Sequence, residues 1–161
     1  MKHMKGVIIV VLLIMALLIT PAQAEEPYEG TWCYAGTITA FHDSKDLAPV
    51  RGLQINGIWM SQSENKFLNN AAGHCECALR GVGENLHVFC YCRFIEPNGD
   101  IVIMKYEVNG KEAGSTLLEG TGKYKGIKGG HKSVPIARGK PPIQGVATGC
   151  QKLTGAYEIA K

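Results

Sequence analysis

The sequence predicts an all-β fold, a small antiparallel β-barrel of about eight strands, and three observations support this expectation. First, the chain has 161 residues, 45% of them hydrophobic and 19% charged, which is typical of one folded domain. Second, it contains 20 glycines, and each glycine inside a helix costs about 1 kcal/mol relative to alanine. Third, short segments rich in β-branched and aromatic residues alternate with turn sequences, and no amphipathic helix is predicted.

The N-terminal segment has the three parts of a secretory signal peptide. Two lysines form a basic start, and an apolar run of 14 residues ends at Ile19. Ala22 and Ala24 supply the small residues of a cleavage site. The run is too short for a stable membrane anchor, which needs about 20 apolar residues. We therefore expect residues 1–24 to be a signal peptide and residues 25–161 to be a single β-barrel domain that is periplasmic or secreted.

Five segments between residues 31 and 108 have the composition of strands. They are residues 31–41, 50–60, 74–80, 86–95 and 101–108. The first is rich in β-branched and aromatic residues, and two glycines interrupt the second. A polar loop separates these two strands, and a mixed stretch that includes a possible helical turn at residues 69–72 precedes the third.

The remaining strands are expected in a glycine-rich stretch beyond Ser115. Two or three strands fit there, and the last covers residues 153–159. Between residues 120 and 157 the sequence has seven lysines and arginines and no acidic residue. Such a stretch attracts an anionic ligand or membrane headgroups, or keeps surface loops soluble.

Turn sequences set the expected pairing of the central strands. With Gly83-Glu84 as a two-residue turn, Glu76 lies opposite Tyr91. With Asn98-Gly99 as a second two-residue turn, flanked by alternating apolar residues, Tyr91 lies opposite Tyr106. The three residues then form one row across three strands.

This row gives the candidate ligand site. If its face lines the lumen of the barrel, polar groups converge in an apolar cavity, as in most small-molecule sites. The candidate ligand-binding residues are Glu76, Tyr91, Arg93 and Tyr106, and Glu76 is the candidate catalytic base. The alternative is that these charged residues form the solvated outer face of an amphipathic sheet.

Six cysteines follow the signal peptide, and an even number in an exported protein favours disulfides. The same pairing of the third and fourth strands places two cysteine pairs at sites without backbone hydrogen bonds, where Cα atoms lie about 4.5 Å apart. The remaining two cysteines lie on the first and last strands, which are neighbours in a closed barrel. The expected disulfides are Cys75–Cys92, Cys77–Cys90 and Cys33–Cys150.

A metal site is the alternative for the two C-x-C pairs, because four thiolates can bind Zn²⁺ or Cu(I). Strand alternation places all four cysteines on one face, but neighbouring positions on a flat sheet do not arrange four thiolates tetrahedrally around a metal ion. We therefore expect no metal. The sequence also has no phosphate loop, H-E-x-x-H or G-x-S-x-G motif, so no cofactor is expected.

Three segments resemble the allene oxide cyclase barrel-like family. Residues 74–108 (HCECALRGVGENLHVFCYCRFIEPNGDIVIMKYEV) are similar to its central hairpins, residues 117–129 (LLEGTGKYKGIKG) to its G-G-T-G-K-Y-x-G-I segment, and residues 154–159 to its closing strand. The resemblance covers residues 59–159 and implies a small eight-stranded barrel with a narrow lumen, lipocalin-like in shape and shared with dirigent proteins. It also implies that the chain is similar to small secreted bacterial members. The two C-x-C pairs depart from the family pattern of one cysteine per strand.

Two functions of different class follow. The favoured one is an exported barrel that binds a small apolar or amphipathic molecule without transforming it. The alternative is an isomerase or cyclase resembling allene oxide cyclase, in which a dry lumen holds one substrate conformation. A carboxylate facing aromatic residues in the lumen would favour the enzyme. Removal of Lys2 and Lys5 with the signal peptide lowers the net charge from +3 to +1, so no nucleic acid partner is expected. The oligomeric state is left open.

Overall fold

The structure is a computed structural model that describes residues 24–42, 48–140 and 143–160. Apart from Ala24, the expected signal peptide lies outside the described residues, as does most of the polar loop after the first strand. In the described ranges, no helix has the length and apolar character needed to cross a membrane.

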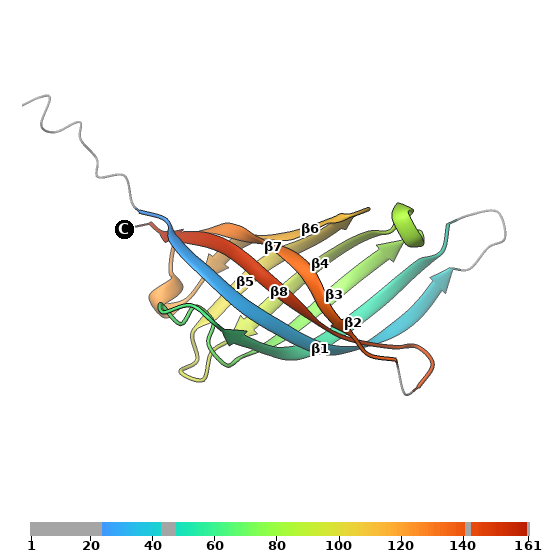
Figure 1. Cartoon of the computed structure of the whole chain (residues 1–161), viewed down its shortest axis with the longest axis horizontal. Helices are drawn as coiled ribbons and strands as arrows, with labels where there is room; N and C mark the ends of the chain where they lie inside the picture. Colours follow the sequence, from blue (N-terminus) through green and yellow to red (C-terminus); the bar gives the residue numbers. More distant parts are fainter. Residues whose placement is uncertain (1–23, 43–47, 141–142, 161) are drawn as a thin grey trace, which may run out of the picture.

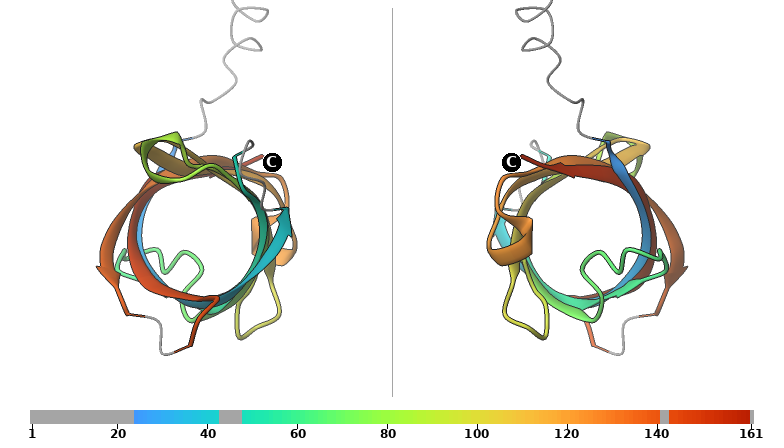
Figure 2. Two further views of the ribbon diagram at one scale, coloured as in Figure 1. Left: turned by 90° about the vertical axis from the view of Figure 1, so that its right-hand side faces the viewer. Right: turned by 90° about the vertical axis from the view of Figure 1, so that its left-hand side faces the viewer.

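The described residues form eight strands in one closed antiparallel barrel (Figures 1 and 2). Each strand pairs with the next, and β8 pairs with β1. The strands are β1 (Glu26–His42), β2 (Val50–Ser61), β3 (Ala71–Arg80), β4 (His87–Ile95), β5 (Ile101–Asn109), β6 (Glu112–Gly120), β7 (Ile127–Arg138) and β8 (Val146–Ile159). Two short 3₁₀ turns, η1 (Gly83–Asn85) and η2 (Gly122–Tyr124), lie in the connections. The expected fold class is confirmed.

Strands extend beyond the predicted segments where small or polar residues weaken the sequence signal. β3 begins at Ala71, within the stretch for which a helical turn was an alternative. β8 begins at Val146, well before residue 153. Gly155 shows why β8 contains glycine: a Cβ at this position would overlap the carbonyl oxygen of Gly130 on β7. Glycine lowers strand propensity, but here it allows two backbones to approach.

The pairing of β3 with β4 is the one that the sequence predicts. Cys75 lies opposite Cys92, and Glu76 lies opposite Tyr91. The connection is longer than two residues: the last pair is Arg80 with His87, and η1 lies between them.

The pairing of β4 with β5 differs from the prediction by one residue. The loop has three residues, Pro97 to Gly99, closed by a hydrogen bond from the Glu96 N–H to the Asp100 carbonyl oxygen at 2.9 Å. Gly99 has a φ of +90°, as three-residue hairpin loops require at their last position. Because side chains alternate along a strand, a shift of one residue reverses the face of all of β5. Tyr91 therefore lies opposite Lys105, and the expected contact with Tyr106 is wrong.

The loop between β2 and β3 folds across one end of the barrel (Figure 2), and its buried side chains fill that end, which we call the closed end. Phe67 and Leu68 in this loop are almost fully buried. The Phe67 ring packs against Tyr28 with centroids 4.2 Å apart and stacks on Tyr157 at 4.8 Å. Burial of two such side chains contributes roughly 1.5–3 kcal/mol each. This outweighs the positive φ of Leu68, +50°, which costs about 1–2 kcal/mol.

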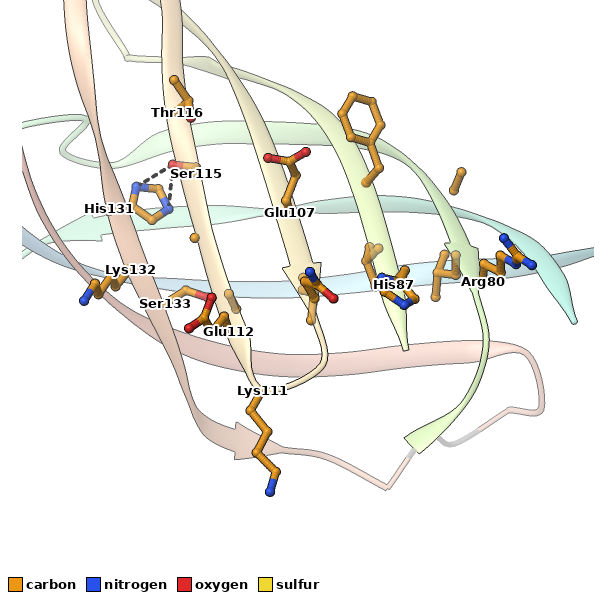
Figure 3. A pocket seen from close by; sticks show the side chains of 18 of the residues that line it. Arg80, His87, Glu107, Lys111, Glu112, Ser115, Thr116, His131, Lys132 and Ser133 are labelled. Atoms are coloured by element: carbon orange, nitrogen blue, oxygen red, sulfur yellow. Dashed lines mark hydrogen bonds between the residues drawn. The ribbon is translucent and has the colours of Figure 1, made fainter. Parts of the chain in front are cut away.

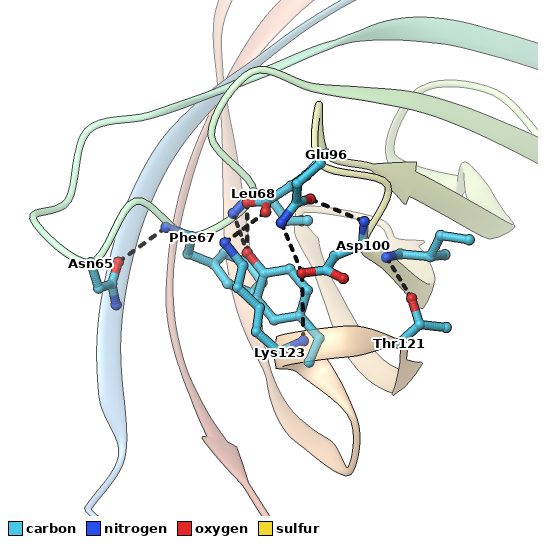
Figure 4. A network of polar contacts seen from close by, with 10 residues as sticks. Asn65, Phe67, Leu68, Glu96, Asp100, Thr121 and Lys123 are labelled. Carbon is cyan, nitrogen blue, oxygen red and sulfur yellow. Dashed lines mark hydrogen bonds and ion pairs between the residues drawn. The ribbon is translucent and has the colours of Figure 1, made fainter.

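A buried polar network fixes the same loop (Figure 4). The Leu68 N–H donates to the Tyr124 hydroxyl at 3.0 Å, and that hydroxyl donates to Glu96 Oε1 at 2.7 Å. Lys123 Nζ lies 2.6 Å from Glu96 Oε2. The Phe67 N–H donates to Asn65 Oδ1 at 3.2 Å. The buried Glu96 is thus both paired and hydrogen-bonded, which is the condition for a carboxylate to be stable inside a protein.

Three disulfides link neighbouring strands of the barrel, with the pairing that the sequence predicts. Two lie side by side between β3 and β4 and contribute buried sulfur to the interior, whereas the third joins β1 to β8. They are Cys75–Cys92, Cys77–Cys90 and Cys33–Cys150. Cys33 alternates with the inward-facing Trp32 and Tyr34, so the third disulfide lies on the outer face. It joins the first strand to the last and closes the barrel covalently.

Candidate functional site

The barrel encloses a cavity of about 690 Å³ that opens at the end opposite the closed end, which we call the mouth. Its walls are mostly apolar side chains and the two inner disulfides. They include Trp32, Ile38, Leu53, Ile55, Trp59, Leu79, Val88, Phe94, Met104, Val108, Leu153, Cys75, Cys90 and Cys92. A volume of this size accommodates a drug-sized molecule.

Polar side chains gather on one wall of this cavity. The Tyr106 hydroxyl on β5 lies 3.0 Å from the Ser133 hydroxyl on β7 and donates to Gln151 Oε1 on β8 at 3.4 Å. Tyr34 on β1 and Arg138 on β7 line the cavity beside them. Burial is the main cause that raises the pKa of Tyr106 above its usual value, against the smaller lowering effects of its hydrogen bonds and of Arg138. The phenol is therefore neutral at physiological pH and can donate a hydrogen bond.

His131 lies deeper on β7 and is 8% exposed. Its Nδ1 is 3.0 Å from the Tyr28 hydroxyl, and the Ser115 hydroxyl lies 2.9 Å from Nδ1 and 3.0 Å from Nε2. Burial lowers the pKa of His131 to about 3, so the ring is neutral. With the proton on Nε2, the ring accepts from Tyr28 and donates to Ser115.

A second hollow of about 1080 Å³, which we call the side groove, is lined mainly by residues of β3 to β7 near the mouth (Figure 3). It includes the region where β6 and β7 separate. These strands pair over three positions, from Thr116 with Gly130 to Gly114 with Lys132. His131 and Ser133 line both this side groove and the lumen, so the two hollows are adjacent. The rim of the groove is more polar than the lumen, with Arg80, His87, Glu107, Lys111, Glu112 and Lys132.

The structure separates the four residues expected to bind a ligand. Tyr106 lines the lumen, whereas Tyr91 is 55% exposed and Arg93 lies on the outer face with it. Glu76 also lies on the outer face, in a polar network with its Oε1 2.9 Å from His74 Nε2 and 3.2 Å from Gln54 Nε2. The row of Glu76, Tyr91 and Tyr106 is therefore not present. Glu76, Tyr91 and Arg93 lie on a solvated outer face, the alternative position considered for them.

The lumen residues that the sequence did not indicate come mainly from β7 and β8. His131, Ser133 and Gln151 lie in the glycine-rich stretch where strand boundaries were not assigned. One signal was available: His131 and Ser133 are two residues apart, so they share a face of any strand that contains both. Without a register for that strand, the face itself could not be chosen.

The described residues contain no group of three or more histidine, cysteine, aspartate or glutamate side chains that could hold a metal ion. The four cysteines of the C-x-C pairs, for which a metal was the alternative, are joined in two disulfides.

No protein-family model matches this sequence. No curated protein matches it either. Among solved structures, the fold is similar to that of the pterocarpan synthase dirigent protein GePTS1, with a TM-score of 0.51 and 10% sequence identity over 86% of this chain and 93% of that chain. At this identity the likeness concerns the fold alone. It agrees with the eight-stranded barrel implied by the resemblance to allene oxide cyclases, and the fold is a dirigent-like β-barrel.

Proposed function

We propose that this protein binds a small apolar or amphipathic molecule in its lumen and does not transform it. The observation that supports this function most directly is the 690 Å³ cavity, open at one end, with apolar walls and a few polar groups on one side. Ligand sites commonly combine these features.

The chemistry of the lining favours binding over catalysis. Among the described residues that line the lumen, none is an aspartate or glutamate, so the carboxylate that would favour an isomerase is not found there. The Tyr106 phenol is held neutral by burial, and His131 is already hydrogen-bonded on both sides. An isomerase or cyclase that acts by holding one substrate conformation stays the second hypothesis, supported by the likeness to a barrel named as a synthase.

Export to the periplasm or outside the cell is part of the proposal. Three disulfides are consistent with an oxidising compartment, and the N-terminal segment has the composition of a signal peptide. N-terminal sequencing of exported protein is expected to begin at Glu25. A chain that retains Met1 would contradict export by cleavage.

Filling the lumen tests the binding function. Ile55 on β2 lines the cavity, and its neighbour Gln54 points outward. We expect Ile55→Trp to weaken binding of a solvatochromic apolar dye at least tenfold, because the indole occupies ligand space. Gln54→Trp adds the same ring to the same strand on the outer face and should leave dye binding within twofold of wild type.

Dye titration by fluorescence gives both affinities, and native mass spectrometry of protein from its own source shows whether a small molecule co-purifies. Equal dye affinity of the Ile55 and Gln54 variants would place the dye site outside the lumen and contradict the proposal. Turnover of a bound molecule would favour the isomerase hypothesis instead.

A further inference from the structure

A β-bulge near the mouth changes which residues of β7 face the lumen. Pro135 pairs with Gln151, but the next pair is Ala137 with Cys150, so Ile136 has no partner of its own on β8. A bulge of this kind shifts the alternation of side chains by one position. After it, Arg138 lies opposite Gly149 on the lumen side, whereas uninterrupted alternation would turn it outward.

The residue opposite Arg138, Gly149, leaves room for the Tyr34 ring on the same wall. Gly149 on β8 has no side chain, and a Cβ there would lie 3.2 Å from the Tyr34 hydroxyl. Arg138, turned inward by the bulge, is an exposed residue of the mouth that lines the cavity together with Tyr34 and Tyr106. Its positive charge acts on the Tyr106 hydroxyl, where it opposes the effect of burial on the pKa.

Arg138 has no counter-charge in the cavity. Among the residues that the structure describes, no carboxylate forms an ion pair with it, and no carboxylate lines the lumen. Of the described lysines and arginines, the other one that lines the lumen is Lys111, which forms an ion pair with Glu84, with Nζ 3.0 Å from Oε1. A guanidinium at the polar edge of an apolar cavity matches a carboxylate in charge and in hydrogen-bonding geometry.

We propose that the ligand is an amphipathic carboxylic acid whose carboxylate binds Arg138 at the mouth while its apolar body occupies the lumen. This inference rests on the proposed binding function and specifies its ligand class. Tyr34, which lines the same cavity, supplies a hydroxyl donor, whereas the Tyr106 hydroxyl already donates to Gln151. Arg138 also belongs to the acid-free basic stretch of residues 120–157, and the bulge gives this one cation a role that the other residues of the stretch do not share.

A matched pair of probes tests the inference on the mature chain with its three disulfides intact. The probes are 11-(dansylamino)undecanoic acid and its methyl ester, which differ in charge and little in size. For wild-type protein we expect the acid to bind at least tenfold more tightly than the ester. Arg138→Gln should remove this preference: the affinity for the acid should fall about tenfold, and the affinity for the ester should stay within twofold of wild type. Arg138→Lys should keep part of the preference, because the charge remains.

Lys140→Gln is the matched control, since Lys140 is an exposed cation two residues away that does not line the lumen. It should preserve the preference for the acid. Equal affinity of wild type for acid and ester, or an equal effect of the Arg138 and Lys140 variants, would overturn the carboxylate inference while leaving lumen binding intact. Failure of both probes to bind would overturn the binding function as well.

Discussion

At the scale of single residues, His131 shows how burial selects one protonation state. The imidazole is surrounded by the Trp59 ring, with centroids 5.4 Å apart, and by the hydroxyls of Tyr28 and Ser115. No carboxylate contacts it among the described side chains, so nothing there compensates a positive charge. Protonation of this ring therefore opposes folding.

We expect the folding stability to depend on pH through His131. In the unfolded chain a histidine takes up a proton near pH 6.5, whereas in the folded barrel its pKa is about 3. The unfolded state thus binds more protons between these values, so the contribution is fully present above pH 6.5 and is lost as the pH falls toward 3. At pH 5 the loss is about 2 kcal/mol.

Urea unfolding at pH 7 and pH 5 measures this loss. His131→Gln, which keeps a hydrogen-bonding side chain without a titrating ring, should show a smaller difference between the two pH values than wild type. His87→Gln changes an exposed histidine on β4 and should keep the wild-type difference. Identical pH dependence in all three proteins would show that His131 does not cause it.

At the scale of elements, one turn decides how much of the site could be predicted. The strands and the cysteine pairing of β3 with β4 follow from composition and alternation, because the turn there preserves the expected register. The β4–β5 loop has three residues instead of two, and this single residue moves Tyr106 to the same face as Cys90 and Cys92. An Asn-Gly pair is compatible with both loop lengths, so local sequence does not distinguish the two registers.

The elements from β6 to β8 were harder to predict for a different reason. Their glycines make the strand signal weak, although several are needed where backbones approach, as Gly155 is against Gly130. The bulge at Ile136 could not be predicted from the alternation of apolar and polar residues, because a bulge interrupts that alternation. For these reasons the polar wall with Ser133, Arg138 and Gln151 requires the three-dimensional pairing of the strands.

At the scale of the whole molecule, Cys33–Cys150 joins the two ends of the barrel sheet. The residues that it links are 117 apart in sequence. The disulfide restricts a long loop in the unfolded chain, and in the chain-entropy model this raises the free energy of unfolding by about 4–5 kcal/mol. The two inner disulfides span 17 and 13 residues and restrict the unfolded chain less.

We expect Cys33→Ala/Cys150→Ala to lower the free energy of unfolding by about 4–5 kcal/mol, measured by urea unfolding under non-reducing conditions. The neighbouring outward-facing pair on the same two strands, Thr31 and Lys152, gives a matched control. Thr31→Ala/Lys152→Ala removes surface contacts only and should cost less than about 1 kcal/mol. A cysteine variant as stable as this control would show that β1 and β8 stay joined without the disulfide.

The loop that carries Phe67 and Leu68 has a consequence for ligand exchange. Because the loop blocks one end of the barrel, a ligand enters the lumen through the mouth with its apolar end first and leaves by the same path. If the carboxylate of the ligand is held near Arg138, the distance from there to Trp59 and Phe94 at the closed end sets the length of apolar chain that fits the lumen. Chains shorter than this length leave apolar wall uncovered. Longer chains have to fold back or extend into the adjacent side groove.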